Sequence, residues 1–250
     1  MISNVRVNSN SRGAACFSEQ GWVYCTESNH SSMRSVTFAH SSHAVPAGKL
    51  LCLGRNYVAH AAEMGAEIPS RPVVFLKPSS AIPAEPGTVR FPSAGKELHH
   101  EVELVVLIGR QARAVAPEQA LAHVAGYGVG LDMTLRDVQA EAKRKGLPWT
   151  VAKGFDDSAP LSPFVAPEQI TDPHDLTISL KVNGSLRQRS STGLMITRIP
   201  ETIAYLSSVF TLDPGDLIFT GTPEGVGPVK RGDLLEAELE GVTSLRVHII

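Results

Sequence analysis

From residue 49 onward, short clusters of apolar residues alternate with glycine and proline, a pattern typical of short strands joined by turns. The clusters predict strands at residues 50–53, 73–76, 101–108, 127–133, 177–182, 216–219, 234–239 and 244–249. Apolar residues at helical spacing predict helices at residues 58–64, 117–123, 135–145 and 200–208. Asn183-Gly184 lies between two apolar residues and predicts a two-residue hairpin turn. The expected fold class is therefore mainly β with short helices (α+β).

The beginning of the chain has a different character, because residues 1–43 are rich in Ser and Asn and contain few large apolar residues. They lack the apolar core of a secretory signal, and Glu19 and Glu27 interrupt the positive character of an organelle-targeting peptide. We expect residues 1–48 to form a poorly packed N-terminal extension and residues 49–250 to form one domain. Met33 is an alternative start of the native protein.

The composition narrows the class of protein and its partners. With 250 residues, 42% of them hydrophobic, and a formal charge of -2, the chain has no basic face for nucleic acid or for a membrane surface. The longest apolar runs are strand-sized, so no transmembrane helix is expected. The cysteines Cys16, Cys25 and Cys52 are odd in number and lack metal-ligand spacing, which favours a reducing compartment such as the cytoplasm.

The most informative segment is LHHEVELVVLIG at residues 98–109, an apolar strand pattern with two acids at its start. Strand alternation places Glu101 and Glu103 on one face, roughly 7 Å apart. Two carboxylates this close repel each other unless positive charge intervenes, and a metal ion would supply that charge. The alternative is the solvent face of an edge strand, where alternate acids are common.

A third acid favours the metal interpretation. Asp132 ends the run GYGVGLD, where burying an unpaired acid among glycines and apolar residues would be costly. Three carboxylates suit a hard cation such as Mg2+ or Mn2+ better than zinc, with positions left open for water and substrate.

Several longer strings follow one another along the chain: LGRNYVAHAAEM (residues 53–64), FLKP (75–78), HHEVEL (99–104), LDMTLRDVQ (131–139), KGLPWTVAKGFDDSAP (145–160) and GTPEGVGPV (221–229). In this order they resemble the fumarylacetoacetate hydrolase family, closest to its short acylpyruvase or fumarylpyruvate hydrolase-like branch. The resemblance implies a single catalytic domain with a mixed β-sandwich roll, and a homodimer. It also implies Glu101, Glu103 and Asp132 as the ligands of Mg2+ or Mn2+.

The resemblance also assigns roles to other residues. His60 and Glu63 share a face of a predicted short helix, which would be either an inconsequential surface pair or a carboxylate-oriented base. The similar segment in the family is a lid whose His-Glu pair activates water, with Gly54 and Gly65 as candidate hinges. Lys153, in an apolar run, is either a snorkelling surface lysine or, by the resemblance, the group that meets the 2-oxo oxygen.

Further substrate contacts are expected around the same site. Arg136 and Gln139 lie on one face of the helix that follows Asp132. Arg55, Tyr57 and Thr222 complete the predicted set, the last in a glycine-rich segment that would otherwise be only a tight turn. We expect His99 and His100 to orient Glu101 or to pack locally. Asp157 stands where the family pattern has an uncharged residue.

The predicted activity is hydrolysis of the C–C bond of acylpyruvates, 2,4-dioxo acids resembling acetylpyruvate or fumarylpyruvate, to pyruvate and an acid through a metal-bound enolate. The same site would also support oxaloacetate decarboxylation, or isomerisation or tautomerisation of a 2-oxo dicarboxylate. A non-catalytic metal-binding module is the alternative outside the enzymes. The small 2-oxo acid is the expected partner, and the compartment is the cytoplasm or, in a eukaryote, the mitochondrial matrix.

Overall fold

The computed structural model describes residues 16–18, 21–23, 34–41, 44–65 and 67–250. The chain divides into two compact units, Met1–Met33 and Arg34–Ile250. In the first unit, β1 (Cys16–Ser18) pairs antiparallel with β2 (Gly21–Val23). The prediction of a poorly packed extension also concerns other residues before Arg34, which lie outside the described residues.

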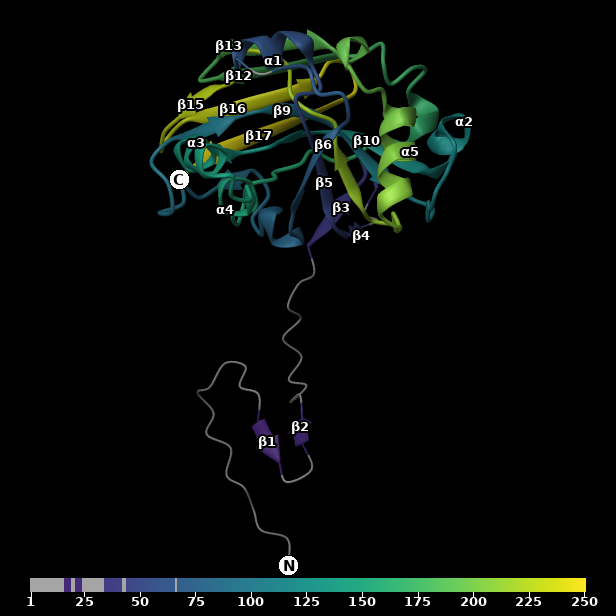
Figure 1. The fold of residues 1–250 in the computed structure, drawn as a ribbon, viewed down its shortest axis with the longest axis horizontal. Coiled ribbons are helices and arrows are strands. Elements are labelled where there is room, and N and C mark those ends of the chain that lie inside the picture. Colours follow the sequence, from purple (N-terminus) through teal and green to yellow (C-terminus); the bar gives the residue numbers. More distant parts are fainter. Residues whose placement is uncertain (1–15, 19–20, 24–33, 42–43, 66) are drawn as a thin grey trace, which may run out of the picture. The chain divides into compact units, whose positions relative to one another are not determined.

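The second unit is built around two five-stranded sheets (Figure 1). The first, here called the central sheet, contains in spatial order β10 (Val124–Leu131), β9 (Val102–Ile108), β14 (Leu217–Phe219), β5 (Leu50–Gly54) and β6 (Val73–Lys77). The second, the outer sheet, contains β13 (Ser185–Ser191), β12 (Thr177–Val182), β16 (Leu234–Leu239), β17 (Thr243–Ile249) and β7 (Thr88–Val89).

Alternation along the central strands explains how the sheets pack. On β9, Val102, Leu104 and Val106 join the larger hydrophobic core, together with side chains of the outer sheet. Val105 and Leu107 point to the opposite face and join a second, smaller core. Because both faces are covered, β9 is buried along its whole length and reads as a continuous apolar run. The two sheets and the core between them form the expected β-sandwich.

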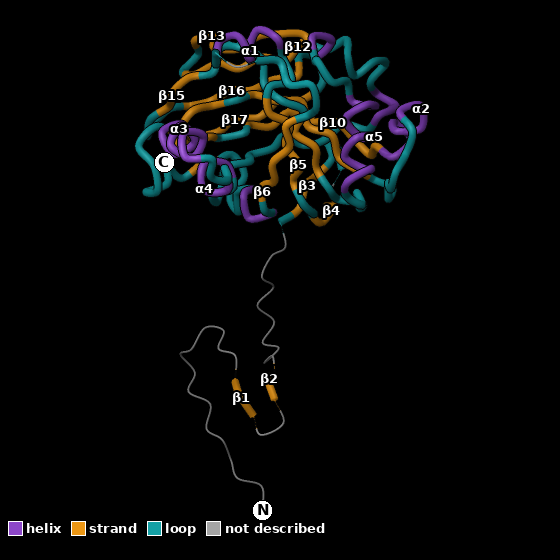
Figure 2. The backbone as a smooth tube through the Cα atoms, in the orientation of Figure 1, coloured by secondary structure: helices purple, strands orange, loops and turns teal. Residues whose placement is uncertain are grey.

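Smaller elements close the unit around these sheets. A three-stranded sheet contains β11 (Thr134–Leu135), β8 (Leu98–His100) and β15 (Gly227–Val229), and β3 (Ser35–Thr37) pairs with β4 (Ala44–Pro46). The α-helices are α1 (Val58–Glu63), α2 (Pro117–Ala120), α3 (Arg136–Lys145), α4 (Thr150–Lys153) and α5 (Ile199–Val209). Figure 2 shows them at the periphery of the unit, with α2 beside α5 and α3 beside α4. None of the helices in the described residues is long and apolar enough to cross a membrane.

All of the predicted strands are present, with ends shifted by three residues at most. Helix α4 was not predicted, because a four-residue helix is too short to show a helical period. Strands β8 and β15 were also missed, since each has only three residues and β15 contains a proline.

The packed unit begins earlier than residue 49, the predicted start of the domain. Val36 of β3 is only 4% exposed and belongs to the smaller core. Ala39 donates its backbone N–H to the carbonyl of Phe164 at 2.8 Å. Residues from Arg34 onward therefore belong to the compact unit, because a short two-stranded sheet gives them both pairing and burial.

Candidate active site

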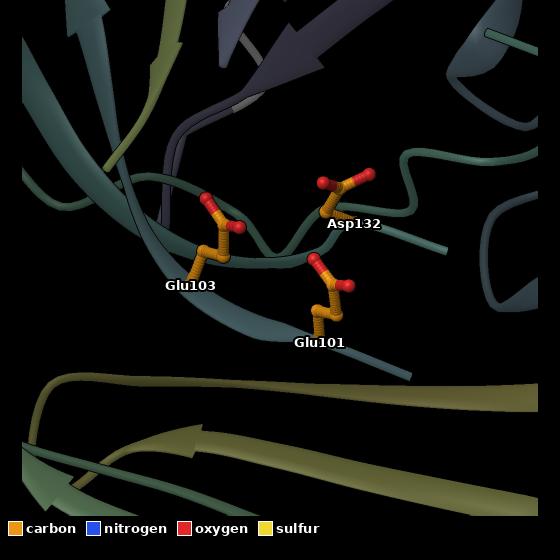
Figure 3. A group of neighbouring side chains, drawn as sticks. All are labelled: Glu101, Glu103 and Asp132. Atoms are coloured by element: carbon orange, nitrogen blue, oxygen red, sulfur yellow. The ribbon is translucent and has the colours of Figure 1, made fainter. Parts of the chain in front are cut away.

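Three carboxylates meet at the ends of two neighbouring central strands (Figure 3). Glu101 immediately precedes β9, Glu103 lies within it, and Asp132 immediately follows β10. One oxygen from each carboxylate lies within 4.8 Å of one from each of the others. Glu103 is 1% exposed on a strand flanked on both sides, which excludes the alternative of a solvent-facing edge strand.

Glycines in β10 make room for the packing beside the cluster. A Cβ at Gly130 would lie 2.8 Å from Val105 Cγ2 and 2.9 Å from Phe219 Cε1. Only a residue without a side chain lets these groups approach so closely. The end of β10 that leads into Asp132 therefore contains glycine at residue 130 for packing reasons.

Three buried or half-buried cations surround the acids. Lys153 Nζ donates to Glu101 Oε2 at 2.8 Å and to Asp132 Oδ2 at 2.5 Å, and Lys77 Nζ lies 2.7 Å from Asp132 Oδ1. Arg136 Nη2 donates to Glu101 Oε1 at 2.5 Å. These three positive charges balance the three carboxylates, so a bound divalent cation would leave the site positive toward an anionic substrate.

The pKa values of the acids diverge because the cations are unevenly distributed. Burial by itself raises the pKa of Glu101, but Lys153 and Arg136 outweigh it and hold the pKa below its usual range. Burial, followed by repulsion from Asp132 and Glu101, raises the pKa of Glu103 well above its usual value. Without a metal ion, Glu103 therefore keeps its proton more strongly than Glu101 does.

Asp132 provides a test of whether the cluster suits a metal ion. Lys77 donates its protons to the carbonyls of Met133, Lys153 and Ser158, so the nearby Asp132 Oδ1 receives no hydrogen bond. Within the described residues, this oxygen is buried and without a hydrogen-bond partner. This carboxylate oxygen, which is ion-paired with Lys77 but accepts no hydrogen bond, lies among the hard oxygen donors that a Mg2+ or Mn2+ site requires. The residues present therefore fit the predicted cofactor.

A cavity of about 420 Å³, its open mouth included, adjoins the cluster. Its walls include His60, Glu101, Glu103, Lys153 and Thr222. Its enclosed part is only about 30 Å³, which favours a small acid over a polymer. Lys153 has committed two of its three N–H groups to carboxylates, which leaves one for a ligand in the cavity.

The predicted lid pair comes together on α1. His60 Nδ1 lies 3.3 Å from Glu63 Oε2, and because a carboxylate only accepts, Nδ1 carries the proton and Nε2 keeps its lone pair. Burial lowers the pKa of His60, so the neutral, basic form persists near neutral pH. Gly225 donates its backbone N–H to Glu63 Oε1 at 3.0 Å, which fastens α1 to the glycine-rich segment at residues 221–229. Gly65, one of the two candidate hinges, has a φ of 58°.

The predicted substrate contacts separate into two groups. Arg55, Arg136, Gln139 and Thr222 line the cavity. Tyr57 does not line it: its side chain is 1% exposed and packs in the larger core, because it points inward beneath α1.

Arg136 lines the cavity but is held by protein groups. It donates to Glu101 and, at 2.6 Å, to Gln139 Oε1. Its main role in this structure is thus to orient a carboxylate. Gln139 keeps its amide N–H groups for a ligand, since its oxygen accepts from Arg136.

The flanking histidines have local partners, as expected. His99 Nε2 lies 2.7 Å from Glu97 Oε1, and His100 Nδ1 lies 3.0 Å from Gln188 Oε1. Asp157, with a φ of 64°, accepts from Arg90 Nη1 at 3.0 Å. That ion pair accounts for a charged residue where the family pattern has an uncharged one.

Two important side chains were missed by sequence reasoning. Lys77 ends the apolar run VVFLK of the edge strand β6 and is its one buried residue. A lysine in an apolar run is the signal that indicates a paired ammonium. Gln188 lies in the polar strand SLRQRSS, where strand alternation places its side chain on the opposite face of the sheet from those of the exposed Arg187 and Arg189. Its partners lie far away in sequence, so their identity was not predictable.

Comparison with known proteins agrees with this geometry. The model of the fumarylacetoacetate (FAA) hydrolase C-terminal family matches residues 49–250. The bovine (Bos taurus) mitochondrial oxaloacetate tautomerase FAHD1 is 52% identical over 200 residues, which cover 80% of this chain and 90% of that protein. An uncharacterized protein of Pyrococcus abyssi is 48% identical over 218 residues, covering 87% of this chain and 97% of the relative.

A solved structure is also similar. The fumarylpyruvate hydrolase of Pseudomonas aeruginosa, crystallised with Mn2+ and pyruvate, is 42% identical, with a TM-score of 0.82 over 86% of this chain and 95% of that one. The metal in that structure and the buried carboxylates here support Mg2+ or Mn2+ as the cofactor. The chain belongs to the fumarylacetoacetate hydrolase family.

Proposed function

We propose that this protein is a divalent-metal-dependent hydrolase that cleaves the C–C bond of acylpyruvates, 2,4-dioxo acids resembling acetylpyruvate or fumarylpyruvate, to pyruvate and a second acid. The observation that carries the proposal is the buried Glu101, Glu103 and Asp132 cluster in direct continuity with a cavity walled by the His60 base. A metal site without a base would suit a binding module equally well.

Glu101, Glu103 and Asp132 would hold the metal ion, which would supply a Lewis acid for the 2-oxo group and for the charge that develops as the C3–C4 bond breaks. His60 Nε2 removes a proton from water as the water oxygen attacks the distal carbonyl carbon, C4; the C3–C4 bond then breaks, and the enolate takes up a proton at C3 to give pyruvate. Glu63 keeps the opposite nitrogen of His60 protonated and the ring oriented. The remaining N–H of Lys153 and the amide N–H groups of Gln139 face developing negative charge in the cavity. Lys153 and Arg136 keep Glu101 ionised and ready to bind the metal.

Oxaloacetate tautomerisation or decarboxylation is the second candidate, favoured by the FAHD1 relatives, which are named as oxaloacetate tautomerases. These reactions need proton transfer or loss of carbon dioxide, and neither needs water to attack a carbonyl. The two activities therefore make different demands on His60: hydrolysis needs it to activate water, whereas decarboxylation does not.

The deciding experiment measures turnover of acetylpyruvate, fumarylpyruvate and oxaloacetate, each with Mn2+ and with excess chelator. We expect Mn2+-dependent release of pyruvate from at least one acylpyruvate. Selective turnover of oxaloacetate would favour the second candidate. Absence of turnover of all three by protein with bound Mn2+ would refute both and indicate a non-catalytic metal-binding module.

We further propose a homodimer, supported by membership of the family, which sedimentation velocity would test. The mammalian FAHD1 relatives are named as mitochondrial, which supports the matrix as the compartment if this protein is eukaryotic.

A further inference from the structure

Gln188 is a buried amide in an otherwise polar strand at the edge of the outer sheet. Its neighbours Arg187 and Arg189 are exposed, whereas Gln188 is 1% exposed. A buried amide is costly unless its hydrogen-bonding groups are satisfied, so its partners indicate why it is there.

Every position of the Gln188 amide is used. Its Oε1 accepts from the backbone N–H of Val102 at 3.1 Å and lies 3.0 Å from His100 Nδ1. Its Nε2 donates to Thr222 Oγ1 and to the carbonyl of Pro223, both at 2.9 Å. An amide has two lone pairs and two N–H protons, so this set fills its capacity.

The two backbone partners fix which way the amide faces. The Val102 N–H only donates and must meet Oε1, whereas the Pro223 carbonyl only accepts and must meet Nε2. The hydrogen-bonding roles of the other two partners, His100 and Thr222, are then fixed. His100 Nδ1 carries a proton, and Thr222 Oγ1 is an acceptor toward Gln188.

This fixes the direction of the Thr222 hydroxyl proton. Thr222 is buried, and its side chain lines the cavity beside Glu103 and Lys153. Because one of its lone pairs accepts from Gln188, its O–H is free to donate, and within the described residues no other hydrogen bond to Oγ1 is present. The accessible direction for that proton is the cavity.

We propose that Gln188 is a positioning residue that sets the polarity of the Thr222 hydroxyl, so that the cavity presents a hydrogen-bond donor to the carboxylate of the bound 2-oxo acid. The proposal rests on the proposed function, since it assumes a 2-oxo acid in the cavity. Gln188 lies on β13, does not line the cavity, and reaches the ligand through Thr222. Its contacts with His100 and Val102 also support the segment that carries the metal ligands, so the test separates these two roles.

The test is a double-mutant cycle on the full-length protein with Mn2+ bound, using pyruvate as the probe and isothermal titration calorimetry as the readout. Gln188→Glu keeps the acceptor facing Val102 and His100 but, when ionised, presents an acceptor to Thr222, whose O–H then turns away from the cavity. We expect pyruvate affinity to fall about 10-fold to 100-fold, the range for losing a hydrogen bond to a charged group. Thr222→Val should cause a similar loss, and Thr222→Ser should remain near the wild type.

The cycle distinguishes positioning from support of the metal ligands. In the Thr222→Val background, we expect Gln188→Glu to weaken pyruvate binding by less than about threefold, because no hydroxyl is left to orient. Mn2+ affinity should stay within about threefold of wild type in each variant. Additive losses, or a fall in Mn2+ affinity that matches the fall in pyruvate affinity, would overturn the proposal in favour of a purely structural role.

Gln188→Met provides a second variant if the buried carboxyl prevents folding or stays protonated. It removes the orienting donor without adding charge, and it should weaken pyruvate binding about 5-fold to 10-fold. If neither variant changes pyruvate affinity by more than twofold, or if Thr222→Val binds pyruvate normally, the Gln188 proposal fails while the proposed function stands. If the wild type with bound Mn2+ neither binds pyruvate nor turns over any 2-oxo acid, both fail.

Discussion

The effect of Glu103→Gln on the free energy of unfolding should change sign when metal is added. The variant should be more stable than the wild type without metal and less stable than the wild type with metal. In the metal-free protein, burial and the neighbouring Asp132 and Glu101 raise the pKa of Glu103 well above its usual value. Once the pH rises above the ordinary pKa of a glutamate, the folded state therefore keeps a proton that the unfolded state has lost. The free energy of unfolding of the wild type then falls as the pH rises through that window, by about 1.4 kcal/mol for each unit of pKa difference. Glu103→Gln has no such proton to lose.

In chelator, we therefore expect Glu103→Gln to be as stable as the wild type at acidic pH and more stable as the pH rises. Its amide oxygen still accepts from Gly221 N–H, which donates to Glu103 Oε2 at 2.7 Å. With Mn2+ at a hundred times its Kd, the wild type gains about 2.7 kcal/mol. For a chain of this length, that corresponds to a Tm rise of about 5–11 °C. The variant, which lacks one charged ligand, should gain little.

Thermal unfolding monitored by circular dichroism, from pH 5 to pH 8.5 with chelator or with Mn2+, measures both effects. Glu238→Gln is the matched control, because it makes the same change at an exposed position of β16 away from the site. Calorimetry of Mn2+ binding in two buffers should show proton release by the wild type. A Glu103→Gln variant that is less stable than the wild type in chelator across this range would refute the reasoning.

The other predictions concern the lid and the buried lysine. His60→Gln should keep Mn2+ affinity but lower the rate of acylpyruvate hydrolysis by about 10²–10⁴-fold, and an undiminished rate would exclude His60 as the base. Because burial lowers the pKa of His60, the kcat/KM of the wild type should fall only below about pH 6.5. Gly225→Ala places a Cβ 2.2 Å from the carbonyl oxygen of Arg187 at a φ of 92°, so it should displace the segment that binds Glu63 and lose more stability and activity than Gly232→Ala, which has a φ of 90° but open space; equal losses would show that the close approach of residue 225 to Arg187 is not required. Lys153→Met leaves two buried carboxylates without their shared partner and should cost about 3–5 kcal/mol in urea unfolding with chelator, partly recovered with Mn2+; a loss below 1 kcal/mol would contradict the ion-pair arrangement.

The sequence predicted those parts of the fold that depend on local pattern. The period-two apolar positions of β9 and the hairpin at Asn183-Gly184 follow from backbone geometry, which acts over a few residues. The same period placed Glu101 and Glu103 on one side before any fold was known. The cost of burying an acid then made Asp132 the natural third member.

Partner choice could not be predicted in this way. Arg136, expected to contact substrate, lines the cavity and also holds Glu101. Tyr57 was expected at the cavity but packs in the core. Both outcomes depend on how separate segments meet in space. The local sequence around a side chain is the same whether that side chain contacts a ligand or another protein group, so it does not reveal the partner.

The sequence by itself predicted most of the longer strands, the family, and the three acids and the His60-Glu63 pair as candidate site residues, because these depend on short-range geometry and on motifs that occur in order along the chain. Only the tertiary structure decided that Lys77 approaches Asp132 and that Gln188 joins His100 to Thr222. Residues 88 positions apart, such as Gln188 and His100, become neighbours only when the sheets pack. The hydrogen bonds and charges that set the pKa values and hydroxyl orientation of the site therefore first exist in the folded molecule.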